Sequence, residues 1–439
     1  MPLMSRTKSV WSSLSTSISI ILLSLLISSC GGNNSLMNAP AVLTVAFSST
    51  GALNGSNNAN PATNIWTGKS DGSGVAPLTQ LTASGADSTE PIWSPDGRKI
   101  AFVSTRALDG SDAAGTANNI WIMNADGSNA APLTRLTASG IVNWQLAWSP
   151  DGRKLAFASS AALDGSDGVN VNGAFNVWVI NGNGTAATPV TRLTVTEPDG
   201  SWTSQQPIWS PDSTRLAFLS VGALNGADAL NPNRVFNIWT AKADGSGVAP
   251  LTSLSANGVS HAYPAWSPDG TKIAFIAQRA LDGTDSPSPT NAMNLWTINT
   301  DGSAATPLTR LITSAFLFYP VWSSNGGKIA FGADLALDGS DALNTNAAEN
   351  VWTINANGTG AFAVSRLTTT GINFVLPLTW SPDGKKIGFT SQRAVDGSDA
   401  ANPNGQTNVW LLNADGSGAM PLTHLTSSTA SSGLPVWKP

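Results

Sequence analysis

The chain has 439 residues and a net charge of −5, and only 11% of its residues are charged. It contains no run of Lys or Arg that could follow a phosphate backbone, so we expect no nucleic-acid partner. Gly (42 residues) and Pro (26 residues) are frequent, and both mark turns, which indicates many short strands rather than helices. Cys30 is the single cysteine, so an intrachain disulfide is excluded.

The first residues have the pattern of an export signal. Arg6 and Lys8 precede an apolar stretch, densest over 18–27, that is shorter than the roughly 20 residues a membrane-spanning helix needs. Its end, Ile27-Ser28-Ser29-Cys30, resembles the lipobox of bacterial lipoproteins. That resemblance implies a signal peptide over 1–29, lipidation of Cys30 and a flexible tether over 30–41. An ordinary signal peptide with an incidental cysteine is the alternative.

The lipidated cysteine would anchor the protein in the cell envelope through lipid alone. Gly31 follows Cys30, a pattern that resembles outer-membrane sorting in Gram-negative lipoproteins. We therefore expect an outer-membrane protein that faces either the periplasm or the cell surface.

Two tryptophan motifs alternate through residues 42–439. Asn-[Ile/Val/Leu]-Trp occurs seven times, and a second motif, usually Trp-Ser-Pro-Asp-Gly, occurs six times and ends the chain in a truncated copy at Trp437. The repeat is roughly 57 residues long, which is typical of arrays of one supersecondary unit. The motif tryptophans are Trp66, Trp121, Trp178, Trp239, Trp296, Trp352 and Trp410, and Trp93, Trp148, Trp209, Trp266, Trp322, Trp380 and Trp437.

Each repeat divides into four short apolar runs that predict four strands. In one repeat these are residues 91–93, 99–103, 119–124 and 133–137, with a Ser-Pro-Asp-Gly turn after the first and Asp126-Gly127 after the third. Four antiparallel strands per repeat predict an all-β, seven-bladed β-propeller, in which the motif tryptophans pack between blades. The first repeat begins at its second strand, residues 43–48, and we expect residues 434–437 to supply its first strand and so close the ring.

The run of motifs, Trp-Ser-Pro-Asp-Gly, Lys-Ile-Ala-Phe, Asn-Ile-Trp and Leu-Thr-x-Leu-Thr, resembles the TolB-type (WD40-like) propeller repeat over about residues 42–437. The resemblance implies that the turns lie on one face of the ring and the long insertions and crossovers on the other. We expect no counterpart of the N-terminal domain of TolB, and no hydrolase domain of the kind that oligopeptidases join to such a propeller.

An insertion between the second and third strands distinguishes these repeats. Each copy carries Asp or Asn, then Gly, and then a second Asp or Asn. Clustered carboxylates suit Ca²⁺, but two acids fall short of the usual six to eight oxygens, so we favour a structural Asx-turn loop over a Ca²⁺ site. The candidate ligands are Asp109 and Asp112, Asp164 and Asp167, Asp282 and Asp285, Asp338 and Asp341, and Asp396 and Asp399.

The crossovers into the innermost strands are where the repeats differ, which makes the mouth of the central channel the best place for a specific site. Aromatic faces between Gln and Glu side chains suit a sugar or an extended peptide, although these residues could also simply plug the channel. The candidates are Glu90, Trp144, Gln145, Trp202, Gln206, His261, Tyr263, Phe318 and Tyr319.

The sequence offers little for catalysis. His261 and His424 are the only histidines, no nucleophile is identifiable, and zinc spacing is absent. We therefore expect a monomeric, non-catalytic propeller without a cofactor, which binds an envelope protein or glycan. The alternative is a carbohydrate-active enzyme, a polysaccharide lyase or hydrolase, with its site at the channel mouth.

Overall fold

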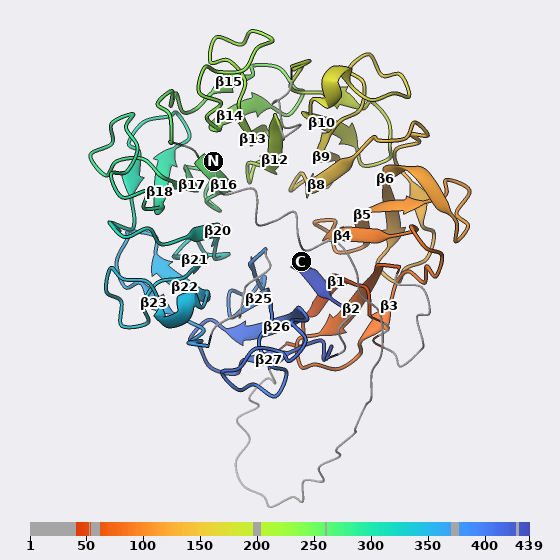
Figure 1. Ribbon diagram of the computed structural model, residues 1–439. Helices are drawn as coiled ribbons and strands as arrows, with labels where there is room; N and C mark the ends of the chain where they lie inside the picture. The colour runs from red at the N-terminus through yellow and green to blue at the C-terminus, as the bar shows by residue number, and fades with distance from the viewer. Residues whose placement is uncertain are drawn as a thin grey trace, which may run out of the picture.

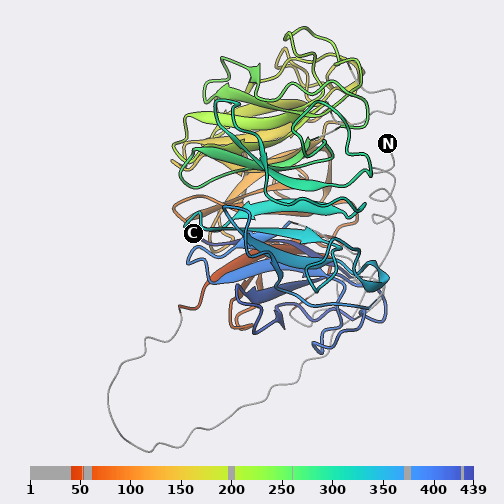
Figure 2. The ribbon, with the colours of Figure 1, turned by 90° about the vertical axis from the view of Figure 1, so that its left-hand side faces the viewer.

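A computed structural model describes residues 41–51, 53, 62–195, 203–259, 261–369, 377–426 and 430–439. Seven four-stranded antiparallel sheets stand around a central axis, which confirms the predicted seven-bladed β-propeller (Figure 1). Figure 2 shows the same ring from its side. Cys30 and the predicted signal peptide lie outside the described residues. In the described part of the chain, no helix is long and apolar enough to cross a membrane.

The blades are numbered here in chain order, with the strands of each given from the axis outward. Blade 1 has β28 (Ser432–Trp437), β1 (Thr44–Ser49), β2 (Asn64–Lys69) and β3 (Ala76–Pro77). Blade 2 has β4 (Ser88–Trp93), β5 (Lys99–Arg106), β6 (Ala114–Asn124) and β7 (Ala131–Pro132). Blade 3 has β8 (Asn143–Trp148), β9 (Lys154–Ser159), β10 (Asn176–Asn181) and β11 (Thr188–Pro189). Blade 4 has β12 (Ser204–Trp209), β13 (Arg215–Ser220), β14 (Asn237–Lys242) and β15 (Ala249–Pro250).

The remaining three blades follow the same order. Blade 5 has β16 (His261–Trp266), β17 (Lys272–Ala277), β18 (Asn294–Asn299) and β19 (Thr306–Pro307). Blade 6 has β20 (Leu317–Trp322), β21 (Lys328–Ala333), β22 (Asn350–Asn355) and β23 (Phe362–Ala363). Blade 7 has β24 (Thr379–Trp380), β25 (Lys386–Ser391), β26 (Asn408–Asn413) and β27 (Met420–Pro421). Two single-turn 3₁₀ helices, η2 (Val171–Gly173) and η3 (Thr345–Ala347), lie in insertion loops.

The two ends of the chain share blade 1, as expected. Strand β28 pairs antiparallel with β1, with Trp437 opposite Val45 and Ser432 opposite Ser49. This pairing gives blade 1 its innermost strand and closes the ring without leaving β1 as a free edge.

Each blade has an aromatic pair at its centre. The tryptophan of the third strand lies directly opposite the phenylalanine of the second strand, as Trp121 does opposite Phe102. The same cross-strand pair occurs in all seven blades, and these side chains are buried between neighbouring sheets. Opposed aromatic residues stabilise a sheet pair and fill the wedge between blades, which accounts for the repeated motif.

The fourth strand is shorter than predicted. Residues 133–137 were expected as a strand, but β7 covers only Ala131–Pro132. The chain beyond it is held by the side chain of Asn119, whose Nδ2 donates to the Leu136 carbonyl while its Oδ1 accepts from the Leu136 N–H. A buried amide therefore replaces the main-chain ladder. Equivalent bonds are made by Asn64, Asn176, Asn237, Asn294, Asn350 and Asn408.

Neighbouring blades are joined at the turn face, which carries the Ser-Pro-Asp-Gly turns. The indole N–H of Trp209 in blade 4 donates to the carbonyl of Ala147 in blade 3. Trp322 donates in the same way to Ala265, in the blade before it. Trp93, Trp380 and Trp437 repeat this contact. The innermost strands are thereby held in a fixed relation around the axis.

Candidate functional site

The innermost strands bring the predicted channel residues into the middle of the ring. Glu90 lies within β4 rather than before it, at a point where the pairing of β4 with β5 shifts register between Thr89 and Ile92. Such a β-bulge re-aims one side chain. The bulge residue has a positive φ in each case: Glu90, Gln145, Gln206, Tyr263, Tyr319 and Leu434, with φ from 47° to 56°. Because these strands lie nearest the axis (Figure 1), the six residues form a ring around it.

The polar members of this ring are linked from blade to blade. The Glu90 carboxylate accepts a hydrogen bond of 2.6 Å from the main-chain N–H of Gln145. The Gln145 side-chain oxygen accepts from the N–H of Gln206 at 2.7 Å, and that of Gln206 accepts from the N–H of Tyr263 at 3.0 Å. Each side chain therefore satisfies a main-chain donor that the next bulge leaves outside its own ladder.

This series of blade-to-blade hydrogen bonds ends at Tyr263, because a phenol has no carboxylate or amide oxygen that could accept from the next strand. Instead, the ring of Tyr263 lies against that of Tyr319, with centroids 4.0 Å apart and planes 31° from parallel. One part of the ring is thus amide and carboxylate, and the adjoining part is aromatic.

Glu90 is the one ionisable carboxylate among the six described ring positions. Burial raises the pKa of Glu90 to about 7, against the opposing effect of the hydrogen bond from Gln145. Burial also raises the pKa of Tyr319, and the Tyr263 phenol and the Glu90 charge add to that increase. Glu90 and the tyrosine pair therefore share one electrostatic environment that resists negative charge.

His261 does not reach the channel, which corrects its predicted place at the mouth. Its side chain is 1% exposed and packs edge-on against Phe275 with centroids 4.7 Å apart. The Nδ1 atom lies 3.0 Å from the hydroxyl of Thr252, which already donates to Asn237. The imidazole must therefore carry its proton on Nδ1, and burial lowers the pKa of His261 to about 3. Regular strand alternation would place His261 and Tyr263 on the same face of β16. The bulge at Tyr263 breaks this alternation, so the His261 side chain is buried instead.

Two further aromatic candidates, Phe318 and Trp144, are not in the ring either. Phe318 is buried, 9% exposed, and packs over Gly332 in the blade interior. Trp144 is half-buried and meets Phe175 edge-on at 6.4 Å between centroids. Trp202 lies outside the described residues.

The paired acids of the insertion loops serve two different contacts. The first acid forms an Asx turn within the loop, as Asp282 does by accepting from the N–H of Thr284. The second acid crosses to the preceding blade. Asp285 of blade 5 accepts from the N–H and hydroxyl of Ser255, which follows the last strand of blade 4. We call this contact the blade clip. Asp112, Asp167, Asp228, Asp341 and Asp399 form the same clip.

Hydrogen bonds lower the pKa of two of these carboxylates. The Thr82 hydroxyl lowers the pKa of Asp112, and the Thr137 hydroxyl lowers the pKa of Asp167. Across the described residues, no three His, Cys, Asp or Glu side chains are placed to hold one metal ion. The contacts are those of a structural loop, and the alternative, a Ca²⁺ site at these positions, stays untested.

A signal in the sequence could have located the bulges. Proline directly follows the bulge residue at Pro91, Pro207, Pro264, Pro320 and Pro435. Proline cannot donate to a ladder, so within a sheet it is confined to edges, strand starts and bulges. Leu146 takes this place in blade 3, so proline marks five of the six described bulges.

Comparison with known proteins finds a partial similarity to one curated peptidase. No protein-family model matches it. The uncharacterized peptidase YuxL of Bacillus subtilis is 27% identical over 224 residues, which are 46% of this chain and 30% of YuxL. The chain therefore spans less than a third of that curated relative. This similarity contradicts the expectation that the chain is not an enzyme.

The solved structures that resemble the chain support the fold. A puromycin-hydrolyzing peptidase from Mycobacterium tuberculosis has a TM-score of 0.54 and 13% identity, with 83% of this chain and 50% of that one covered. An oligogalacturonate lyase from Vibrio parahaemolyticus has a TM-score of 0.52 and 13% identity, with 80% and 83% covered. TolB from Acinetobacter baumannii also matches, with a TM-score of 0.44 and 16% identity over 73% of this chain and 63% of TolB.

Proposed function

We propose that this propeller is the substrate-binding part of a peptidase and that it holds an extended, positively charged peptide in its central channel. The similarity to YuxL supports the reaction class. The channel ring supports the ligand, since Glu90 is the single carboxyl group among amide, phenol and leucine side chains at the described ring positions. Burial raises the pKa of Glu90 to about 7, so a bound cation would favour its ionised form. The amino terminus of a peptide carries one matching positive charge.

The geometry around Glu90 is the observation that carries the proposal. The carboxylate is fixed by the Gln145 N–H at 2.6 Å, so it does not have to be ordered when a ligand arrives. It is half-buried, which strengthens its interaction with a cation relative to an exposed carboxylate. The stacked Tyr263 and Tyr319 add aromatic surface beside it, and aromatic faces also attract cations.

A binding measurement on the purified full chain tests the proposal. A labelled alanine peptide with a free amino terminus should bind at least about tenfold more tightly than its acetylated form. Glu90→Gln should remove that difference, while an amide oxygen can still accept from Gln145, as the oxygen of Gln145 itself accepts from Gln206. Equal binding of the two peptides by the parent protein would overturn the proposed ligand.

The matched control removes one negative charge elsewhere. Asp244→Asn changes an exposed turn between β14 and β15, and Asn183 and Asn357 already fill the same turn position in other blades. This variant should bind as the parent does. We expect this chain to bind the peptides without cleaving them, and cleavage by this chain alone, detected by mass spectrometry, would contradict its assignment as the substrate-binding part.

A further inference from the structure

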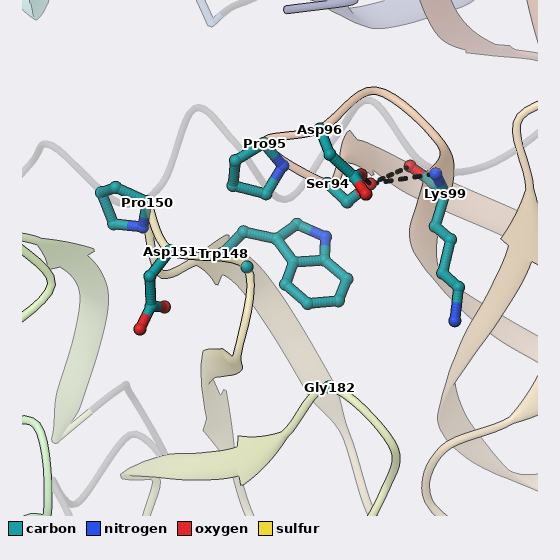
Figure 3. A pocket seen from close by; sticks show the side chains of 9 residues that line it. Ser94, Pro95, Asp96, Lys99, Trp148, Pro150, Asp151 and Gly182 are labelled. Atoms are coloured by element: carbon teal, nitrogen blue, oxygen red, sulfur yellow. Dashed lines mark hydrogen bonds between the residues drawn. The ribbon is translucent and has the colours of Figure 1, made fainter.

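A cavity lies at the turn face between blades 2 and 3, and none of the six ring residues lines it. Its volume is about 430 Å³, which falls within the range of small-molecule sites. Figure 3 shows it between the two Ser-Pro-Asp-Gly turns. The lining residues are Ser94, Pro95, Asp96, Lys99, Trp148, Pro150, Asp151, Gly152 and Gly182.

Gly182 makes this junction different from others in the ring. The equivalent position after the third strand is alanine in four blades, at Ala125, Ala243, Ala356 and Ala414. A Cβ on Gly182 would lie 2.9 Å from Cζ3 of Trp148 and 3.3 Å from the Gly152 carbonyl oxygen. Because Gly182 has no methyl group, the indole of Trp148 fits against it and the cavity beside the indole stays open.

Trp148 is presented to this cavity. It is half-buried, whereas the equivalent Trp93 and Trp209 are each 7% exposed. Its indole N–H makes none of the inter-blade hydrogen bonds formed by those two tryptophans. In Figure 3 the indole lies below the turn that carries Pro95, on the side of Gly182, with the turn that carries Pro150 beside it. One aromatic ring and two proline rings thus give the cavity an apolar wall.

The rim of the cavity carries both hydrogen-bond acceptors and donors. In Asp96 and in Asp151, Oδ1 accepts from the turn serine and from a main-chain N–H, while Oδ2 only approaches an exposed arginine, at 4.0 Å and 3.8 Å. Within the described residues, the Lys99 ammonium makes no hydrogen bond or ion pair. The equivalent Lys154 and Lys272 each donate to a neighbouring oxygen.

From this arrangement we propose that the cavity binds a neutral sugar ring. The C–H face of a pyranose would lie on the Trp148 indole, and its hydroxyl groups would donate to Asp96 or Asp151 and accept from Lys99. Apolar walls with a few placed polar groups are the usual composition of a small-ligand site. The carboxylates at the rim can accept hydrogen bonds from sugar hydroxyl groups, and the lysine ammonium can donate to them.

The main chain around the cavity favours a sugar over a peptide strand. The turn N–H groups are already bonded, with Gly97 donating to Ser94, Gly152 to Ser149, and Gly182 to Arg153. A peptide that adds to a sheet needs a free strand edge, and these turns offer none. A polyhydroxylated ring needs only the side chains at the rim.

Saturation-transfer NMR on the purified full chain tests this proposal, with cellobiose, chitobiose and maltose as probes and triproline as the peptide probe. At least one of the sugars should bind, and triproline should not. Trp148→Ala should weaken sugar binding by about tenfold or more. Gly182→Ala should also weaken sugar binding, because it places a methyl group against the indole. We expect this variant to fold, since four other blades carry alanine at the equivalent position.

Two control variants leave the cavity intact. Trp266→Ala removes the half-buried tryptophan of the same motif in blade 5, and Gly168→Ala adds a methyl group at an ordinary contact distance of 3.8 Å in the insertion loop of blade 3. Both should bind sugar as the parent does. The proposal is overturned if no sugar binds, if triproline alone binds, or if Gly182→Ala and Trp148→Ala leave sugar binding unchanged.

Discussion

The carboxylate of Glu90 in β4 accepts a 2.6 Å hydrogen bond from the main-chain N–H of Gln145 in β8, and so joins the innermost strands of two blades. Because burial raises the pKa of Glu90 to about 7, ionisation of this group is less favourable in the folded protein than in the unfolded chain. Its contribution to stability is therefore greatest below about pH 4.5 and is lost as the pH rises through 7.

Glu90→Gln removes this titration and keeps an oxygen that can accept from Gln145. We expect the free energy of unfolding of the variant, relative to the parent, to increase between about pH 5 and about pH 8. Urea unfolding at several pH values measures it. A difference between the two proteins that does not change with pH would contradict the raised pKa.

His261 should have the opposite effect on the acid side. Burial lowers its pKa to about 3, whereas an unfolded histidine titrates near 6.5, so protons bind the unfolded chain first as the pH falls. The stability contribution of the neutral imidazole is present above about pH 6.5 and is lost toward pH 3. His261→Leu should therefore flatten the loss of stability between about pH 6 and about pH 4, as measured by thermal unfolding. An unchanged acid slope would show that the imidazole is accessible to protons.

The blade clip of Asp285 should contribute to stability across the junction of blades 4 and 5. Its carboxylate accepts from the N–H and the hydroxyl of Ser255. We expect Asp285→Ala to lower the free energy of unfolding by about 1 kcal/mol, because partly exposed hydrogen bonds contribute modestly. Asp285→Asn keeps one acceptor oxygen and should lose less. Equal losses in the two variants would contradict the clip.

The same contacts predict how the protein responds to a chelator. Protein N–H and hydroxyl groups already occupy the Asp109 and Asp112 carboxylates, as they do in the other loops. We expect excess EDTA to leave the melting temperature unchanged. A clear decrease that added Ca²⁺ reverses would contradict this expectation and favour the Ca²⁺ site.

The number of blades and the strands within each blade could be predicted from the sequence, because the motifs that specify them are short and recur in every repeat. Each of the two tryptophan motifs occurs once per blade, so their number gives the number of blades. The cross-strand partner of each Asn-x-Trp tryptophan is the phenylalanine of the second strand, as in the Lys-Ile-Ala-Phe run. The missing first strand of blade 1 has an obvious counterpart at Trp437, and β28 takes that place. Propensity and periodicity act over a few residues, so such features follow from the sequence alone.

The details of the site depend on contacts between residues that are distant along the chain. The bond from Gln206 to Gln145 spans 61 residues, and it forms only because two bulges face each other around the axis. A positive φ at Glu90 or Tyr319 is uncommon for such residues, and strand alternation does not predict it; only the proline that follows each of them indicates a bulge. The bulge also moves His261 to the opposite side from Tyr263, so strand alternation placed that histidine wrongly.

The central claim, that Glu90 receives the positive group of a peptide in the channel, is tested most directly by a crystal structure of the full chain with the free-amino alanine peptide. We expect the peptide within the ring, with its ammonium in hydrogen-bond contact with the Glu90 carboxylate and its chain against Tyr263 and Tyr319. A peptide bound outside the channel, or one whose amino terminus points away from Glu90, would contradict it.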